Sequence, residues 1–223
     1  FDRRGAIAMA TGSARIKRTG AGLLAVFCWF SLLLQLVLHI QVTNGLGLPL
    51  AESLIRFFSY FTIQTNILAA LVLTAFAIKA SLDEWLVHPF VRSAVAVYIA
   101  MVGITYHTLL RRLWEPKGAQ WFADTALHTV MPVCYLLFWF ACVRKAGLRW
   151  YDPLLWLIYP LFYLGFVLVR GKMSGFYPYP FIDAKTLGYA GVAANTAGLL
   201  IVCATIGICL VVIGWWLSRR QPA

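Results

Sequence analysis

Six runs of mainly apolar residues, separated by short polar connections, dominate the pattern along the chain. A helix needs about 20 residues to cross a hydrocarbon core about 30 Å thick, with a usual range of roughly 17–25. The first five runs have that length. The sixth is longer, so we expect it to tilt, to begin in the headgroup region or to project beyond the bilayer. The runs cover residues 20–40, 57–78, 91–110, 121–143, 153–169 and roughly 187–217. The pattern predicts an all-α fold, an integral membrane bundle of six transmembrane helices.

The connections between these runs are too short to hold a separate soluble domain. We therefore expect one transmembrane domain over residues 20–217, an N-terminal segment over 1–19 and a tail over 218–223. Residues 1–8 precede Met9 and are expected to be an addition or an upstream extension. The first run is long enough to span and lacks a small-residue cleavage site, which favours a membrane helix over a cleaved signal peptide.

Composition and charge agree with this architecture. The chain is 61% hydrophobic and 12% charged, whereas soluble domains are about 45–50% apolar and about 25% charged. The net charge of +11 lies in the gaps between the apolar runs, where basic residues face lipid headgroups, and this argues against a nucleic-acid partner. Six spans place both termini on one side, and twelve of the 19 basic residues fall there: Arg3, Arg4, Arg15, Lys17, Arg18, Lys79, Arg92, Arg144, Lys145, Arg149, Arg219 and Arg220. The excess predicts that both termini are cytoplasmic.

Polar side chains interrupt the second and fourth runs, although burying such groups in a membrane is costly and they usually line an interior or a cavity. Helical periodicity puts Ser59, Thr62 and Asn66 on one stripe of the second helix. Asp124 and His128 are four residues apart and share a face of the fourth helix. These two stripes are the candidate site.

The hydroxyl of Thr62 and the imidazole of His128 are expected at the same depth, roughly 8–10 Å below the outer boundary. A hydroxyl becomes a good nucleophile when an adjacent base, oriented by a third group, takes its proton. Thr62, His128 and Asp124 supply these three roles in the logic of a catalytic triad. Pro132 has no N–H for the carbonyl of His128, so we expect the fourth helix to kink there. The alternatives are a Thr bonded to its own backbone, an Asp that stabilises a first helical turn and a His that only packs.

His39 and His107, near the outer ends of the first and third helices, offer a competing interpretation with His128 as haem or metal ligands. However, none of the three has a second His at helical spacing. The five cysteines lie inside apolar runs without metal-binding spacing, so we interpret them as small apolar helix residues: Cys28, Cys134, Cys142, Cys203 and Cys209. We expect no metal site.

The connection at 175–183, between the last two runs, alternates aromatic residues with proline. Tyr177 and Tyr179 in it are typical of interfacial anchors. The segment is also expected above Thr62, so it is a candidate lid or wall of a lipid entrance. Asn195 in the sixth run is a further polar residue that we expect to face the interior.

Four segments carry a resemblance to a known family over nearly the whole span from the first to the sixth helix. They read YFTIQTN at 60–66, TYHTLLR at 105–111, DTALHTVMP at 124–132 and YPYPFID at 177–183. The chain resembles the bacterial branch of a six-helix family whose animal relatives are the androgen-induced membrane proteins and the androgen-dependent regulator of tissue factor pathway inhibitor. The Thr of the second helix and the His-x-x-x-Pro of the fourth are its most specific pieces.

The resemblance implies an intramembrane threonine hydrolase that cleaves fatty acid esters of hydroxy fatty acids. Its essential Thr and His fall on Thr62 and His128, and it implies no metal and no cofactor. An Asn stands in the animal proteins where this chain has Asp124, which leaves the orienting role of Asp124 open. The bacterial branch implies the inner membrane as the location.

We therefore expect a lipid ester hydrolase whose long-chain ester enters laterally from the outer leaflet. Ser59, Asn66, His107, Tyr177, Tyr179 and Asn195 are the candidate substrate-binding residues, with Asn66 and Asn195 as candidate oxyanion donors. The alternatives are a non-enzymatic lipid-binding or transport protein and, third, a haem-binding redox protein. The chain length of the substrate and the oligomeric state do not follow from the sequence.

Overall fold

A computed structural model describes residues 3–78, 86 and 88–219 of the chain, and this part is helical without any strand. Six helical stretches are long and apolar enough to cross a membrane: Gly12–Gly45, Phe61–Ile78, Pro89–Leu110, Gly118–Cys142, Asp152–Ser174 and Ala184–Ser218. The prediction of an all-α bundle with six membrane-crossing helices is confirmed.

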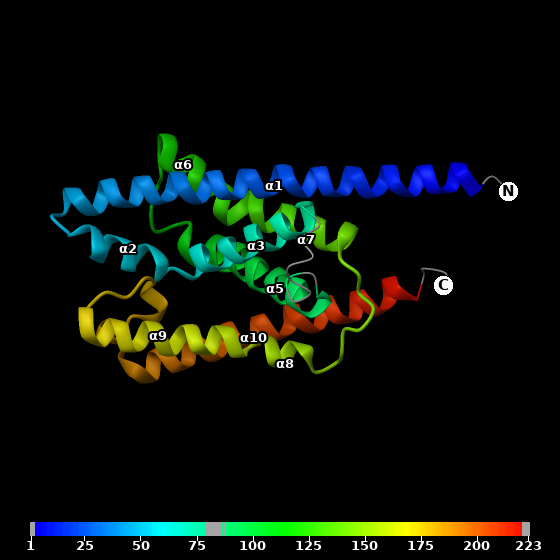
Figure 1. Cartoon of the computed structure of the whole chain (residues 1–223). Helices are drawn as coiled ribbons and strands as arrows, with labels where there is room; N and C mark the ends of the chain where they lie inside the picture. Colours follow the sequence, from blue (N-terminus) through cyan, green and yellow to red (C-terminus); the bar gives the residue numbers. More distant parts are fainter. Residues whose placement is uncertain (1–2, 79–85, 87, 220–223) are drawn as a thin grey trace.

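The helices run alternately up and down a single elongated bundle (Figure 1). In chain order they are α1 (Arg3–Gly45), α2 (Leu50–Phe58), α3 (Phe61–Ile78), α5 (Pro89–Thr105), η1 (Tyr106–Leu110), α6 (Gly118–Thr125), η2 (Ala126–Val130), α7 (Met131–Cys142), α8 (Asp152–Trp156), α9 (Ile158–Ser174), η3 (Pro180–Ile182) and α10 (Ala184–Ser218). The elements η1 and η2 are single π-helical turns and η3 is a 3₁₀ turn.

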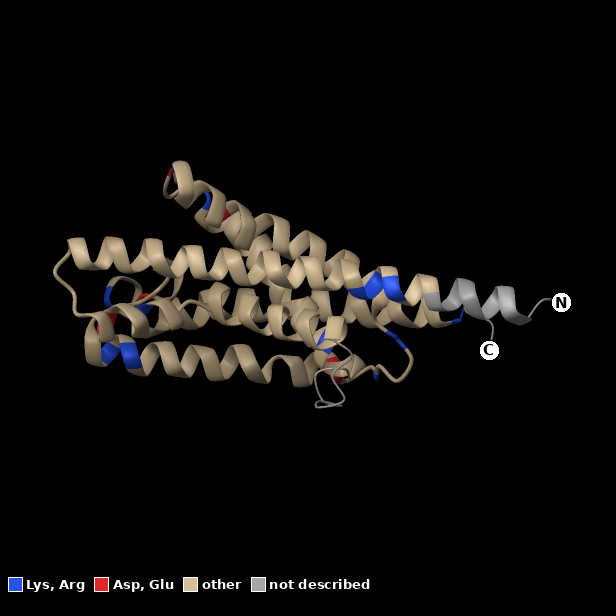
Figure 2. Ribbon diagram, turned by 45° about the horizontal axis from the view of Figure 1, so that its top comes forward, with Lys and Arg blue, Asp and Glu red and all other residues tan. Residues whose placement is uncertain are grey.

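Charged residues gather toward the two ends of this bundle, and the helical stretches between them are almost free of charged residues (Figure 2). The first helix begins and the last helix ends at the same end (Figure 1). Two basic residues counted on that side, Lys79 and Arg220, lie outside the described residues. The cytoplasmic location of this end stays a prediction.

The second apolar run is not one helix, and this corrects the expectation that the helix begins at residue 57. Helix α2 ends at Phe58, Ser59 caps it with φ −80° and ψ −11°, and a new helix begins at Phe61. Ser59 therefore does not share a stripe with Thr62. The break places Thr62 in the first turn of α3, at the mouth of the bundle.

Other helix boundaries also differ from the ends of the apolar runs in the sequence. Helix α1 begins at Arg3, so the segment expected to precede the first span continues it without interruption. The fifth run is divided into α8 and α9 at Leu157. The overlong sixth run contains a break at Gly188, whose φ of 67° and ψ of 166° suit a residue without a Cβ.

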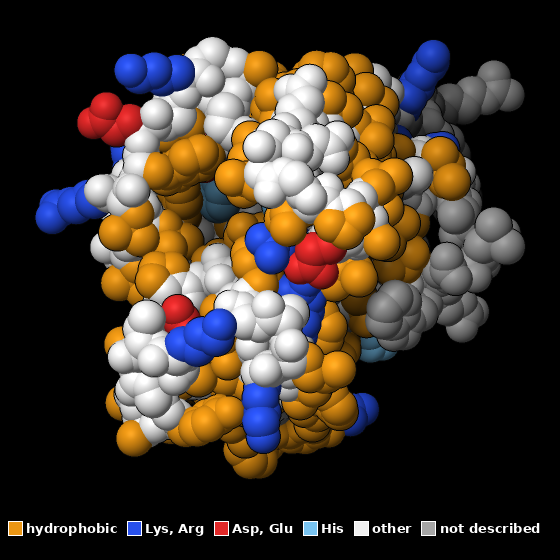
Figure 3. All heavy atoms as spheres, turned by 90° about the vertical axis from the view of Figure 1, so that its left-hand side faces the viewer, with side chains coloured by type: hydrophobic (Ala, Val, Ile, Leu, Met, Phe, Trp, Pro, Cys, Tyr) orange, Lys and Arg blue, Asp and Glu red, His pale blue; other side chains and the backbone are white. Residues whose placement is uncertain are grey.

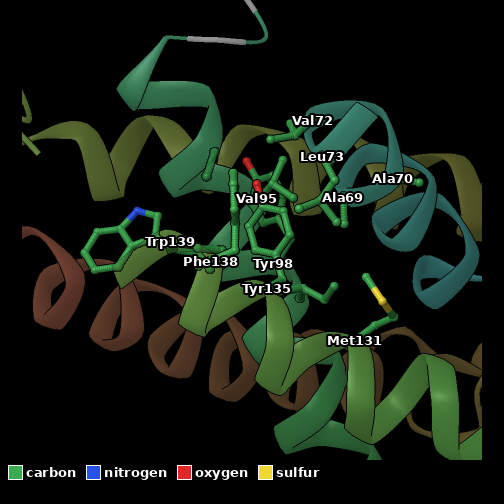
Figure 4. Close-up of a cluster of buried hydrophobic side chains, with 14 of the residues drawn as sticks. Ala69, Ala70, Val72, Leu73, Val95, Tyr98, Met131, Tyr135, Phe138 and Trp139 are labelled. Carbon is green, nitrogen blue, oxygen red and sulfur yellow. The ribbon is translucent and has the colours of Figure 1, made fainter. Parts of the chain in front are cut away.

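The core lies between α3, α5 and α7, where small and large side chains interlock (Figure 4). Ala69 and Leu73 of α3 and Tyr135 and Trp139 of α7 belong to the same cluster, and all four are fully buried. Small residues allow membrane helices to approach closely. By contrast, many large apolar side chains on the outside of the bundle are exposed, as expected for surfaces in contact with lipid.

A smaller cluster anchors the connection at 175–183 against the bundle. Tyr179 and Ile182 pack with Val167 of α9 and Val192 of α10, and all four are buried. The connection therefore folds back toward the N-terminus of α3, where it delivers the hydroxyl of Tyr179.

Candidate active site

Thr62 and His128 meet although they are 66 residues apart in the chain. The Oγ1 atom of Thr62 lies 3.3 Å from Nε2 of His128. Thr62 is buried, and the side chain of His128 is 17% exposed. A general base must lie within hydrogen-bonding reach of the proton that it takes, and this pair meets that requirement in geometry.

The backbone fixes which nitrogen of His128 carries the hydrogen. Nδ1 lies 2.9 Å from the carbonyl oxygen of Asp124, one helical turn earlier. A carbonyl oxygen can only accept, so Nδ1–H donates to it and Nε2 of the neutral ring presents a lone pair. The hydroxyl of Thr62 can therefore donate to Nε2, which is the arrangement that a base needs.

The carboxylate of Asp124 lies beside the same ring. Its Oδ1 is 3.3 Å from Nδ1 of His128, but it has no hydrogen-bond partner of its own because the single hydrogen of Nδ1 points to the carbonyl. Its Oδ2 accepts from the hydroxyl of Tyr106. The ring of Tyr106 stacks on the imidazole at 4.2 Å between centroids, with 17° between the planes. Asp124 thus lies beside the imidazole without a hydrogen bond from Oδ1 to the ring.

Tyr179 approaches Thr62 from the opposite side. Its hydroxyl oxygen lies 3.2 Å from the backbone nitrogen of Thr62, which donates to it, and 3.3 Å from Oγ1. Burial raises the pKa of Tyr179 to about 12, so the phenol keeps its proton at neutral pH. The hydroxyl of Tyr179 can therefore donate to Oγ1, while that of Thr62 donates to His128.

Two π-helical turns frame the site and supply the stacked pair. Tyr106 begins η1, and His128 lies in η2, which ends just before Pro132. Such turns are rare and often occur at functional sites. The irregularity expected from Pro132 is thus a wide turn, in which the N–H of Met131 bonds to the carbonyl of Ala126.

Two cavities meet at Thr62. The larger has a volume of about 360 Å³, opens at the end of the bundle and contains the imidazole of His128. A hollow with a histidine inside it is visible on this end of the molecule (Figure 3). The smaller, of about 100 Å³, is almost entirely apolar and lies between α5, α9 and α10. Thr62, Leu110 and Tyr179 border both cavities.

Asn66 is close to the Thr62–His128 pair, but its side-chain amide is hydrogen-bonded to the backbone. Its Nδ2 donates to the carbonyl oxygens of Thr62 at 2.8 Å and Leu127 at 3.2 Å. With both amide hydrogens engaged, Asn66 has none left for an oxyanion. It instead ties the helix of Thr62 to the turn that carries His128.

The other predicted binding residues lie away from the Thr62–His128 pair. The hydroxyl of Ser59 donates to the carbonyl of Ile55 in α2. Nε2 of His107 lies 3.0 Å from Oγ1 of Thr129, outside both cavities.

Tyr177 and Asn195 support the connection at 175–183 rather than the cavities. The ring of Tyr177 lies on Gly171, and Asn195 donates to the carbonyl of Phe181. Neither residue lines a cavity beside Thr62.

Sequence reasoning missed the part played by Tyr106 and the polar residues of the larger cavity. Gln35 of α1 and Gln120 of α6 both line it, and Gln120 donates to Gln35 at 2.9 Å. Each is an isolated polar residue in an apolar stretch or near its end, and that position was the signal available. Tyr106 carried no comparable signal, because tyrosine near the end of a membrane helix is typical of an interfacial anchor.

The three histidines considered as haem or metal ligands do not all line the same cavity. His39 and His128 line the larger cavity, whereas His107 does not. Within residues 3–78, 86 and 88–219, no group of three or more His, Cys, Asp or Glu side chains is placed to hold a metal ion.

No protein-family model, curated protein or solved structure matches the chain. The resemblance to the androgen-induced protein family stays a prediction, and the proposed function below depends on the geometry of the site.

Proposed function

We propose that the protein is an intramembrane lipid ester hydrolase in which Thr62 is the nucleophile and His128 the general base. The observation that carries the proposal is the 3.3 Å contact between Oγ1 and Nε2, with Nδ1 bonded to a backbone carbonyl. A buried hydroxyl next to an imidazole of fixed tautomer is the arrangement of an activated nucleophile.

In the first half-reaction, Oγ1 attacks the ester carbonyl carbon while Nε2 of His128 takes its proton. The negative charge of Asp124 beside the ring favours the imidazolium that forms. The tetrahedral intermediate collapses when the bond to the alcohol oxygen breaks, and His128 returns the proton to that oxygen. The products are an alcohol and an acyl group on Thr62.

The hydroxyl of Tyr179 is the best placed donor for the oxyanion. It lies beside Oγ1, it stays protonated, and it becomes free to turn when Oγ1 bonds to carbon. Preorganised donors of this kind are often the largest single contribution to acyl transfer. Tyr179 thus takes the role that the sequence suggested for Asn66 and Asn195.

In the second half-reaction, a water molecule attacks the acyl-Thr62 carbonyl and gives its proton to His128. The proton then returns to Oγ1 as the acid leaves. The larger cavity opens at the end of the bundle and borders both residues, so water can reach the ester through it.

The substrate class fits the surroundings of the site. The cavities beside Thr62 are lined mainly by apolar side chains, and the outer surface of the bundle is apolar. An ester dissolved in the bilayer, such as a fatty acid ester of a hydroxy fatty acid or a similar long-chain ester, is already concentrated there. No nucleic acid and no cofactor enters the proposed reaction.

Hydrolysis of lipid esters by the purified full-length protein in detergent micelles tests the proposal. We expect turnover of long-chain esters by the wild type and no turnover by His128→Ala, because without its base the hydroxyl of Thr62 is not activated for attack. A fluorophosphonate probe that labels the wild type but not Thr62→Ala would locate the nucleophile. If the wild type binds a long-chain ester without cleaving it, the alternative of a lipid-binding or transport protein holds instead.

A further inference from the structure

We infer that the two cavities divide the ester at its carbonyl, with the acyl chain in the smaller apolar cavity and the alcohol in the larger one. This inference rests on the proposed function and names the part of the substrate that each cavity takes. It follows from the position of His128 and from the shape of the smaller cavity.

The first step concerns the leaving group. His128 must deliver a proton to the alcohol oxygen, so that oxygen must lie on the side of Thr62 that faces the imidazole. His128 borders the larger cavity and not the smaller one. The alcohol therefore departs into the larger cavity.

The second step concerns the acyl group, which stays bonded to Oγ1 after the alcohol has left. Because Thr62 also borders the smaller cavity, the acyl chain can extend into it without passing the imidazole. The larger cavity is then open for the water that completes the reaction. One shared cavity would leave the chain and the water in competition.

The third step concerns the depth of the smaller cavity and the polarity of the residues that line each cavity. The smaller cavity descends along α10 from Thr196 to Cys203, about two helical turns or about 10 Å. Met101 of α5 lines its deep part beside α10. The apolar walls of the smaller cavity suit a saturated acyl chain. The larger cavity is lined by the hydrogen-bonded amides of Gln35 and Gln120, which suit a polar alcohol.

The lining of the smaller cavity should therefore set the acyl-chain length. Leu200 borders it and is only partly buried, so a larger side chain there can be accommodated without disrupting the core. Leu200→Trp should shorten the space for the chain. Met101→Ala should lengthen it.

Two ester series measured on purified protein separate the two halves of the substrate. One series varies the acyl chain as the butanoyl, octanoyl and hexadecanoyl esters of one alcohol. The other varies the alcohol with the octanoyl group kept. For Leu200→Trp we expect kcat/KM for octanoyl and hexadecanoyl esters to fall about tenfold relative to the butanoyl ester, with the order of alcohols unchanged. Met101→Ala should shift the preference toward longer acyl chains.

A matched control replaces Leu113, which borders only the larger cavity and is exposed. Leu113→Trp should change the order of alcohols and leave the order of acyl chains as in the wild type. The opposite pattern, with Leu200→Trp acting on the alcohol and Leu113→Trp on the acyl chain, would reverse the assignment.

The failure of this inference differs from the failure of the proposed function. If the wild type cleaves no ester, the proposed function itself is wrong. If the wild type cleaves esters but Leu200→Trp and Met101→Ala leave the acyl preference unchanged, the acyl chain is elsewhere and only the present inference falls. Thermal unfolding of each variant establishes that it is folded, and Cys203→Phe provides a second obstruction at the deep end.

Discussion

The imidazole of His128 is held by a backbone carbonyl on one side and faces a buried hydroxyl on the other. In this arrangement Thr62 and His128 each need the other for the first chemical step. Their contributions to the rate should therefore not be additive. Mutational effects at these two positions distinguish a catalytic pair from two packing residues.

We expect Thr62→Ala and His128→Ala each to abolish ester hydrolysis while expression and thermal stability stay close to the wild type. The double variant should be no slower than either single variant. Thr62→Ser should keep measurable activity, because it retains the hydroxyl and loses only the methyl group that limits its rotamers. Steady-state kinetics on purified protein check this, and full activity in Thr62→Ala would show that the nucleophile is another group.

Asp124 should contribute to the rate of hydrolysis through its charge and not by selecting the tautomer of His128. Nδ1–H of His128 bonds to the carbonyl of residue 124, which every substitution keeps. Asp124→Asn should therefore cost far less than the about 10⁴-fold that follows when a catalytic His loses the group that sets its tautomer.

Asp124→Ala should cost more than Asp124→Asn, because it also removes the acceptor of the Tyr106 hydroxyl. The ratio of kcat between the two variants measures this difference. Equal losses in both would mean that the carboxylate charge accounts for the whole effect and that the bond to Tyr106 adds nothing to the rate.

Tyr179→Phe should lower kcat about 10²–10³-fold with a much smaller change in KM, the result expected when one oxyanion donor is removed. Because burial raises the pKa of Tyr179 to about 12, its neutral, donating form persists below that pH. The wild type should accordingly show no loss of activity from this residue on the alkaline side until the pH nears that value.

Tyr177→Phe is the matched control, since Tyr177 lines neither cavity beside Thr62. It should leave kcat near the wild type. A loss of kcat in Tyr177→Phe equal to that in Tyr179→Phe would show that both act by supporting the connection at 175–183.

At this scale the sequence could predict a part of the candidate site. The spacing of Asp124 and His128 on a helix brings them together by geometry alone. The contact with Tyr179, by contrast, depends on how a connection folds over the end of the bundle. The tautomer of His128 depends on a backbone atom, and a pattern of residue types contains no information about it.

The ends of helices could be predicted where an apolar run gives way to a polar connection. Breaks within an apolar run could not. The gap between α2 and α3 falls at Ser59 and Tyr60, in a run that contains neither glycine nor proline. The break of α10 at Gly188 lies likewise near the start of a long apolar run. Such breaks follow from the packing of neighbouring elements, which a single run does not show.

The connection at 175–183 is held by two contacts with α9 and α2. The guanidinium groups of Arg56 and Arg170 lie over the ring of Phe176, 4.5 and 5.0 Å from its centroid. Glu52 pairs with both arginines, at 2.7 and 3.0 Å. The ring of Tyr177 lies on Gly171, so close that any Cβ there would overlap it.

Gly171→Ala should therefore displace Tyr177 and, with it, the hydroxyl of Tyr179 from Thr62. We expect faster hydrogen exchange in residues 175–183 and a loss of kcat, while the rest of the bundle keeps its protection. Hydrogen exchange followed by mass spectrometry measures both regions.

Gly165→Ala in the same helix is the control, because a Cβ at Gly165 meets nothing within 4 Å. Both substitutions gain about the same helix propensity, about 1 kcal/mol. If Gly171→Ala and Gly165→Ala behave alike, Tyr177 does not fix the connection.

The molecule as a whole places the candidate site at the end opposite to its two termini. Thr62 lies in the first turn of α3 beside the connection at 175–183, and α1 begins and α10 ends at the other end (Figure 1). The side from which substrate and water arrive therefore depends on the orientation of the bundle. The excess of basic residues on the termini side predicts that this side is cytoplasmic and that the site opens to the outside.

Cysteine labelling in intact cells tests this orientation. Ser174→Cys lies at the end of α9 near the site, and Ser218→Cys at the end of α10 near the chain terminus. A membrane-impermeant maleimide should label Ser174→Cys in intact cells, and Ser218→Cys only after permeabilisation. The wild type is the background control, because its five cysteines lie within the membrane-crossing helices.

The reverse pattern of labelling would place the site on the cytoplasmic side. It would overturn the approach of the ester from the outer leaflet, because the larger cavity would then open inward. It would not alter the contacts between Thr62, His128 and Tyr179, since these depend on packing within the bundle. Orientation and chemistry are thus separate properties of this chain: the distribution of charge at its two ends determines the first, and the polar residues buried at one end determine the second.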